Sequence, residues 1–297
     1  MNIFLTGASG FIGLAVTAEL IRAGHQVTGL ARSDKSEQLL TRMGAQTHRG
    51  ALENPQSLLD GAQKADAVIH CAYDHSFSHP EETARAETQA IAALGRGLQG
   101  SDRPLIITSV AAMGCPSPGQ PAVEDFYDPA TPNPRKSTEI AGERVADKGV
   151  NVAIVRLPQV HNEHRQGFVS ALIALAREKG VSAYVGEGQN QWAAAHLLDV
   201  ARLYRLVAEQ ALPGLRYHAV AEDGIALRDI AQAISTGLSV PLTRLSPADA
   251  DADAHFGWLG RFAQMDMRAS GALTQRRLGW HPSHPGLLQD IARHFSR

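Results

Sequence analysis

The sequence predicts an α/β protein with a doubly wound parallel sheet, followed by a smaller, mostly helical C-terminal region. Three observations lead to this prediction. Short apolar runs alternate with longer amphipathic stretches from residue 1 to about residue 156, which is the order expected of strand–helix–strand units. A glycine-rich turn directly follows the first apolar run. After Arg156 the pattern changes, because glycine, proline and histidine are scattered through residues 157–164.

Six strands and four helices are predicted in the first part of the chain. The strands are short and most of them are apolar, and they cover residues 3–5, 26–30, 45–48, 67–71, 105–108 and 152–155. The helices, in which apolar residues recur at intervals of three and four, lie near residues 11–23, 53–63, 81–99 and 134–148. Strands that alternate with helices in this way form a parallel sheet covered on both faces.

The first domain is predicted to span residues 1–156, and the second region residues 157–297. In the second region, helical patterns cover residues 167–179 and about 199–210, and residues 217–220 have the pattern of a strand. The segment near residues 195–221 is predicted to return to the sheet of the first domain. No internal repeat or long flexible linker is visible, so the two parts are expected to pack closely together.

Composition excludes several classes of protein. The chain has 297 residues, of which 44% are apolar and 20% charged, as in globular rather than disordered proteins. The 28 lysines and arginines against 30 acidic residues leave a net charge of −2, so neither a nucleic acid nor a membrane is expected as a partner. Cys71 and Cys115 form no CxxC pair, which argues against a disulfide framework or a cysteine zinc site.

Targeting and metal signals are not expected either. The amino terminus carries no export signal pattern, and no run approaches the ~18 apolar residues of a membrane helix. We therefore expect a cytoplasmic protein that binds a small molecule, and a homodimer is compatible with the sequence. The 13 histidines include no HExxH pattern, so no metal site is predicted.

The glycine-rich turn predicts a phosphate-binding loop. It reads Thr6-Gly7-Ala8-Ser9-Gly10-Phe11-Ile12-Gly13, between the first strand and the first helix. Glycines at such a turn allow a pyrophosphate to approach the backbone, and the N–H groups and dipole of the helix favour its charge. Gly7, Ser9, Gly10, Phe11, Ile12 and Gly13 are the predicted contacts. The alternative is an ordinary tight turn.

The end of the second strand predicts which dinucleotide binds. An acidic residue about 20 positions beyond the glycines would hold the ribose 2′-hydroxyl of NAD, but Arg32 and Ser33 stand there instead. A guanidinium and a hydroxyl suit a 2′-phosphate. NADP is therefore the predicted cofactor, and a solvated loop arginine is the alternative.

The chain resembles the extended and atypical short-chain dehydrogenase/reductases, which include epimerase/dehydratase-like members. The resemblance covers nearly the whole chain and rests on the glycine loop, residues 106–109 with Gly114, Arg156-Leu157-Pro158, and residues 192–199 with His196. It implies that residues 1–156 form an NADP-binding Rossmann domain and residues 157–297 a substrate-binding region. It also implies cofactor contacts from Leu52, Ala72 and Pro158, although Ala51-Leu52 stands where the family often has Asp-Leu or Asp-Ile, and a side-chain hydrogen bond to adenine is lost.

The resemblance implies a catalytic role for Ser109 and shows one departure. Ser109 lies five residues before Gly114, where the family places a serine or threonine that binds the substrate carbonyl; a strand-end turn is its structural alternative. Arg135 and Glu139 stand where the family has its tyrosine and lysine. Arginine cannot act as the tyrosine does, because it does not lose its proton. Arg135 and Glu139 are expected either to clamp substrate and ribose or to form an ion pair with each other.

Replacement proton donors are expected in the loops at the strand ends. His75 suits proton transfer near neutral pH because an imidazole has a pKa of about 6.5, and Tyr127 is the second candidate. Tyr73 is expected to pack on the cofactor. His161 and His164 are expected to line a loop beside the substrate, and His196 is expected to be a buried, hydrogen-bonded anchor between the two parts of the chain.

The leading hypothesis is an NADP(H)-dependent oxidoreductase that acts on a carbonyl or alcohol of a small, partly apolar molecule. One rival is a sugar-nucleotide epimerase or dehydratase, whose second diphosphate would need basic residues in the C-terminal region. The candidates for that role are Arg165, Arg177, Arg261 and Arg268. The other rival is a catalytically inactive regulator that senses NADP(H). The aromatic residues Trp192, Phe256, Trp258 and Trp280 are expected to lie mostly in the core.

Overall fold

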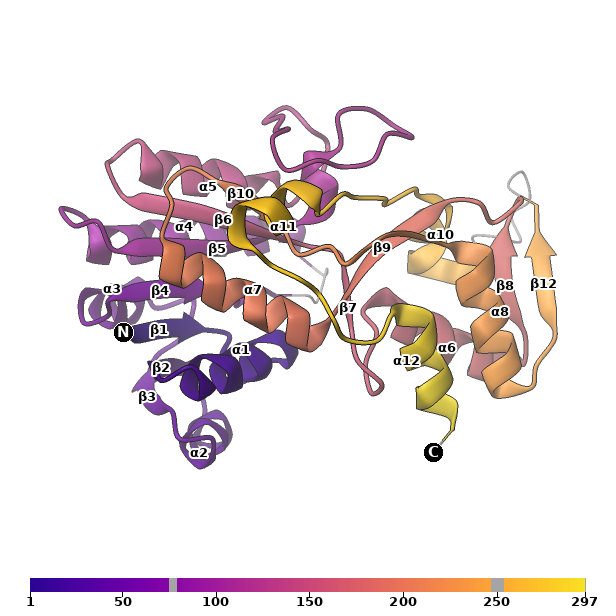
Figure 1. Ribbon diagram of the computed structural model, residues 1–297, viewed down its shortest axis with the longest axis horizontal. Coiled ribbons are helices and arrows are strands. Elements are labelled where there is room, and N and C mark those ends of the chain that lie inside the picture. The colour runs from indigo at the N-terminus through magenta and orange to yellow at the C-terminus, as the bar shows by residue number, and fades with distance from the viewer. Residues whose placement is uncertain (75–78, 247–253, 297) are drawn as a thin grey trace.

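A computed structural model describes residues 1–74, 79–246 and 254–296, and its centre is a seven-stranded parallel sheet (Figure 1). In sheet order the strands are β10 (Arg216–His218), β6 (Asn151–Leu157), β5 (Pro104–Val110), β4 (Ala67–His70), β1 (Asn2–Thr6), β2 (Gln26–Ala31) and β3 (Gln46–Arg49). The strand order reverses between β1 and β4. In a doubly wound sheet, ligands bind beyond the carboxyl ends of the strands at this switch point.

Two apolar clusters, one on each face of the sheet, hold the helices of the first domain in place. Successive side chains of a strand point to opposite faces, so Ile3 and Leu5 belong to one cluster and Phe4 to the other. The first cluster includes residues of α1 (Phe11–Arg22), α2 (Asp34–Arg42) and α7 (Leu197–Gln210). The second includes residues of α3 (Pro55–Gln63), α4 (Pro80–Leu98) and α5 (Lys136–Ala146).

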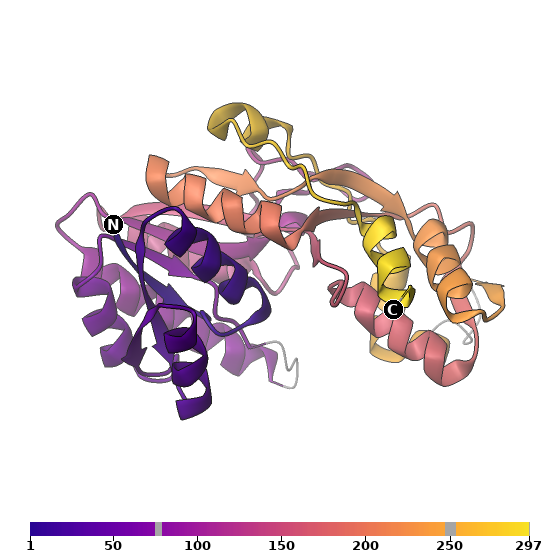
Figure 2. The ribbon, with the colours of Figure 1, turned by 60° about the horizontal axis from the view of Figure 1, so that its bottom comes forward.

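The second region is built around a third apolar cluster and two small sheets. One sheet has the order β11 (Glu222–Ala226), β9 (Gln191–His196) and β7 (Gln159–His161), and the other pairs β12 (Leu242–Leu245) with β8 (Ser182–Val185). The third cluster includes residues of α6 (Phe168–Lys179), α8 (Leu227–Leu238), the 3-10 turn η2 (Gly257–Leu259), α10 (Gly260–Gln264) and α12 (Leu287–Phe295). Figure 2 shows the C-terminal segment running from α11 (Ala272–Leu278), which contacts β10 and α7, back to α12.

The doubly wound α/β fold predicted from the sequence is confirmed. All six predicted strands are present as β1 to β6. The segment near residues 195–221 contains α7 and β10, and β10 pairs with β6 at Tyr217 and Val155. Helix α2 was not predicted, and neither were the strands of the two small sheets, which accompany the helices of the second region.

The large aromatic side chains are mostly buried, as expected. Trp192 and Trp280 are fully buried and Phe256 nearly so, whereas Trp258 is 59% exposed. In the part of the chain that the structure describes, no helix combines the length and apolar character needed to cross a membrane.

Candidate functional site

The glycine loop has a backbone that leaves no room for side chains. Gly7 has a φ of +68°, and a Cβ atom there would lie 2.7 Å from the backbone nitrogen of Ala72. A Cβ atom at Gly13 would lie 2.0 Å from the carbonyl oxygen of Gly7. Gly10 precedes α1, whose first turn holds no acidic residue and has no side-chain cap. The loop therefore offers bare N–H groups at a helix N-terminus, which fits a dinucleotide pyrophosphate.

Arg32 and Ser33 follow β2 at the edge of this loop. Arg32 is exposed, and its guanidinium makes no hydrogen bond or ion pair with the described residues. Ser33 caps α2, because its hydroxyl accepts a hydrogen bond from the Ser36 backbone nitrogen at 3.3 Å. The nearby Arg49 is engaged by Asp34 and Glu37 at 2.7 and 3.1 Å.

A buried polar chain links the start of the glycine loop to α4 and α5. His70 Nδ1 lies 2.7 Å from Thr6 Oγ1, and His70 Nε2 lies 3.2 Å from Glu87 Oε2. Thr138 Oγ1 donates to Glu87 Oε1 at 3.3 Å. Burial alone would raise the pKa of Glu87, but His70, Arg135 and Thr138 outweigh it and the pKa is lowered. The sequence did not predict this series of buried hydrogen bonds. The only indication in the sequence was a histidine and a glutamate that lie within apolar elements.

Arg135 lies at the start of α5 and contacts β5 and the segment that follows β4. Its Cζ atom is 3.6 Å from the centre of the Tyr73 ring, and Nη2 donates to the Thr108 carbonyl oxygen at 2.7 Å. Nη2 is also 3.9 Å from Glu87 Oε1. The Nε and Nη1 atoms of Arg135 are buried and have no hydrogen-bond partner among the described residues. Two charged donors of Arg135 are thus fixed in place without an acceptor in the described part of the chain.

The expected ion pair between Arg135 and Glu139 is wrong, because Glu139 is bound by two other arginines. Arg156 donates from Nε and Nη2 to the two Glu139 carboxylate oxygens, both at 2.8 Å, and Arg216 Nε donates to Oε2 at 2.9 Å. Burial would raise the pKa of Glu139, but these arginines lower it. Ser109 also donates its hydroxyl hydrogen to Glu139 Oε1, at 2.9 Å. Ser109 and Glu139 are both fully or almost fully buried.

Of the two predicted proton donors, one lies outside the described residues and the other packs against Arg216. His75 falls in the segment 75–78, outside the described residues. The Tyr127 ring lies under the Arg216 guanidinium, with 4.2 Å from Cζ to the ring centre. Burial, together with Glu143 and Glu139, raises the pKa of Tyr127 to about 12. Tyr127 therefore holds its proton firmly at neutral pH.

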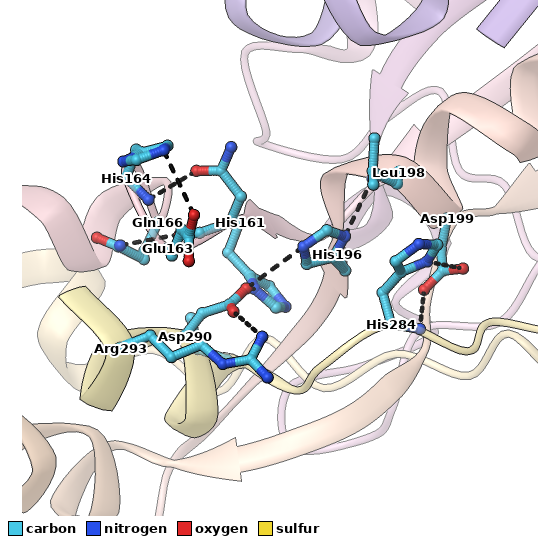
Figure 3. Close-up of polar contacts among 12 residues, drawn as sticks. His161, Glu163, His164, Gln166, His196, Leu198, Asp199, His284, Asp290 and Arg293 are labelled. Carbon is cyan, nitrogen blue, oxygen red and sulfur yellow. Dashed lines mark hydrogen bonds and ion pairs between the residues drawn. The ribbon is translucent and has the colours of Figure 1, made fainter. Parts of the chain in front are cut away.

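A second polar cluster lies within the second region and links β7, β9 and the start of α7 to the C-terminal segment (Figure 3). His161 Nδ1 lies 2.8 Å from Asp290 Oδ2, and His284 Nδ1 lies 2.9 Å from Asp199 Oδ1. The His196 and His284 rings are stacked with centres 4.8 Å apart. His196 is buried and accepts a hydrogen bond from the Leu198 nitrogen at 3.2 Å, as expected of an anchor.

The expectation for His161 is wrong, because His161 ends β7 and is fully buried rather than lining a loop. A surface cavity of about 320 Å³ lies beside the cluster, lined by His196, Glu222, His284 and residues of the segment 282–289. Among the residues that the structure describes, no group of histidine, cysteine and acidic side chains could hold a metal ion.

Comparisons with known proteins identify the family to which the chain belongs. The model of the NAD dependent epimerase/dehydratase family matches residues 3–220. An uncharacterised protein of Schizosaccharomyces pombe is 42% identical over 293 residues, which cover 98% of each chain. The 2-alkyl-3-oxoalkanoate reductase of Stenotrophomonas maltophilia is 29% identical over 231 residues, or 72% of this chain and 67% of that protein.

Solved structures share the fold of this chain. The structure of UDP-glucose 4-epimerase from Thermus thermophilus in complex with NAD has a TM-score of 0.76 at 18% identity, covering 100% of this chain and 99% of that one. The likeness extends over the whole fold, and the family match includes the glycine loop and the strand ends beside it. This confirms the resemblance found in the sequence: the chain belongs to the NAD-dependent epimerase/dehydratase family.

Proposed function

We propose that this protein is an NADP(H)-dependent oxidoreductase that transfers hydride to or from the carbonyl or alcohol carbon of a small, partly apolar molecule. The observation that carries the proposal is Arg135. It occupies the family's tyrosine position beside the glycine loop, and its buried Nε and Nη1 donors have no acceptor among the described residues. Leaving such donors unpaired costs about 1–3 kcal/mol each, so a bound oxygen atom stabilises the site.

Residues of the first domain would hold the cofactor. The backbone from Gly7 to Gly13 would bind the pyrophosphate, and Arg32 with Ser33 would bind the 2′-phosphate. Leu52, Ala72 and Pro158 would contact the remaining parts of the dinucleotide. When bound, a nicotinamide dinucleotide supplies or accepts the hydride.

We assign Arg135 the role of binding the substrate oxygen. Its permanent charge, fixed by Tyr73 and the Thr108 carbonyl, favours a negative charge that develops on that oxygen. Ser109 donates its only hydrogen to Glu139, so we assign it a positioning role that holds the end of β5 against α5. Arg135 releases no proton at working pH, and the proton therefore comes from another group, for which His75 stays the proposed candidate.

The name of one relative supports a reaction at a carbonyl group and suggests a class of substrate. The Stenotrophomonas maltophilia protein is by name a reductase of 2-alkyl-3-oxoalkanoates, which carry a ketone and a carboxylate. A guanidinium binds either oxygen group. We therefore propose small 3-oxo acids as the first substrates to test.

The test of the chemistry follows NADPH absorbance with 3-oxo acids, their methyl esters, simple ketones, aldehydes, quinones and UDP-glucose. We expect turnover of a ketone, and Arg135→Gln should lower kcat/KM by about 10²–10³ with little change in NADPH affinity. Arg144→Gln, at the exposed end of α5, is the matched control and should behave as wild type. Equal rates for Arg135→Gln and wild type would remove Arg135 from the reaction.

The cofactor preference has its own test. Arg32→Asp should weaken NADP+ binding about ten- to a hundredfold, the value of a charge-assisted contact of ~1.5–3 kcal/mol, while NAD+ binding is unchanged or improved. Calorimetry measures both constants. Arg42→Asp, exposed in the last turn of α2, controls for the added charge. Equal affinity of the wild-type protein for NADP+ and NAD+ contradicts the assignment.

One observation favours a second candidate, an NADP(H)-responsive regulator without catalysis. Glu139, at the family's lysine position, is fully buried and committed to Arg156 and Arg216, so the usual partner of a proton donor is missing. Tight NADPH binding with no turnover in the whole panel would support this candidate over the enzyme.

A further inference from the structure

Arg165 of the second region reaches the start of α1, where the glycine loop enters the helix. It lies in the turn after β7, and its Cζ atom is 5.2 Å from the centre of the Phe11 ring. Phe11 is the first residue of α1 and follows Gly10 directly. Arg165 is exposed, and its guanidinium makes no hydrogen bond or ion pair with the part of the chain that the structure describes.

The turn that carries Arg165 is tightly built. Asn162 Oδ1 accepts hydrogen bonds from the backbone nitrogens of His164 and Arg165, both at 2.9 Å. The Asn162 nitrogen donates to the Arg165 carbonyl at 2.8 Å. Gln166, fully buried, donates from Nε2 to the Asn162 carbonyl at 2.9 Å (Figure 3). The backbone at Arg165 is therefore fixed, and the side chain leaves it next to α1.

The charges around Phe11 favour an anion. The N-terminus of α1 carries a partial positive charge, and its first turn contains no acidic residue that would neutralise it. Arg165 adds a full positive charge at the same place, and no described carboxylate pairs with its guanidinium. Two positive groups side by side are stabilised when an anion lies near both.

We propose that Arg165 binds the pyrophosphate of the dinucleotide held by the glycine loop. The second region then contributes to the cofactor site, and a bound cofactor joins the two parts of the chain. The inference goes beyond the proposed reaction, because the pyrophosphate is common to NAD and NADP and binding does not require turnover. It also gives a different role to an arginine considered above for a second diphosphate.

The experiment measures binding, by calorimetry and competition, of NADP+, NAD+ and adenosine 2′-monophosphate, which has no pyrophosphate. Arg165→Ala should weaken NADP+ and NAD+ by the same factor, about tenfold, as expected for one charged contact near the surface. Its affinity for adenosine 2′-monophosphate should match wild type. Arg165→Lys should recover part of the loss, because it keeps the charge.

Two further variants separate this inference from the proposed function. Arg177→Ala removes an exposed arginine of α6 and should change none of the three affinities. Arg32→Asp should show the opposite pattern to Arg165→Ala, losing NADP+ and adenosine 2′-monophosphate but not NAD+. Wild-type dinucleotide affinity in Arg165→Ala, or an equal loss for adenosine 2′-monophosphate, overturns the inference whether or not the protein turns over a substrate.

Discussion

At the scale of single residues, Arg135 and Glu139, which the sequence resemblance aligns with the family's tyrosine and lysine, have separate partners. Arg135 contacts Tyr73, Thr108 and Glu87, whereas Glu139 is the shared anion of Arg156 and Arg216. Lysine at position 139 would place a third cation against two arginines. Restoring both family residues would therefore disrupt the fold rather than recover the ordinary proton donor.

The variant Glu139→Gln tests whether Glu139 stabilises the fold as the counter-ion of Arg156 and Arg216. Removing the charge leaves Arg156, which is fully buried, without its counter-ion, and breaking a buried pair in this way costs about 3–5 kcal/mol. Urea-induced unfolding should show a loss of that size. The matched control is Glu143→Gln, which removes the more exposed carboxylate that pairs with Arg216; such pairs contribute only about 0–1 kcal/mol. Similar losses in both variants would refute a structural role specific to Glu139.

At the scale of elements, local patterns predicted the strands of the first domain but not every helix. Apolar runs identify β1, β2, β4, β5 and β6 because most of their residues are buried, whereas the edge strand β3 is polar and partly exposed. Helix α2 was missed because it is mostly polar and only Ser36 and Leu40 of its nine residues are buried, so few apolar residues mark it in the sequence. The β8–β12 pair joins Leu242 to Ser182, a non-local contact that no local pattern reports.

For the candidate site, too, local sequence patterns predicted one part and missed another. The glycine loop was predictable because its glycines, strand and helix are contiguous in the sequence. The Arg135–Tyr73, His70–Glu87 and Arg165–Phe11 contacts join different elements. Their pairing depends on how the sheet and the second region are assembled, which local spacing does not encode.

At the scale of the whole molecule, three histidines of the second region are buried, and one of them, His218, contacts Arg156 of the first domain. Burial lowers the pKa of His161 and of His196, although Asp290 acts in the opposite sense. Burial and the nearby Arg156 charge lower the pKa of His218 to about 4. His218 Nδ1 lies 2.9 Å from the Ser270 carbonyl oxygen, and Nε2 lies 3.4 Å from Arg156 Nη1. The neutral ring protonated on Nδ1 satisfies both contacts.

These shifts predict that acid weakens the fold before its carboxylates titrate. A histidine whose folded pKa lies below the unfolded value of 6.5 binds its proton more readily when unfolded, so the free energy of unfolding falls as pH drops below about 6.5. The buried carboxylates Glu87 and Glu139 have lowered pKa values, so their contribution is lost only below about pH 4.5. Between pH 7 and pH 5 the loss therefore belongs to the histidines.

His218→Asn isolates one of these groups, because asparagine can still donate to the Ser270 carbonyl but does not titrate. A pKa lowered from 6.5 to about 4 corresponds to about 1.4 kcal/mol per pH unit while only the unfolded state is protonated. Urea unfolding between pH 7 and pH 5 should therefore show a shallower decline for His218→Asn than for wild type. His281→Asn, at an exposed position, should keep the wild-type slope. If His218→Asn declines as steeply as wild type, His218 is not neutral in the fold.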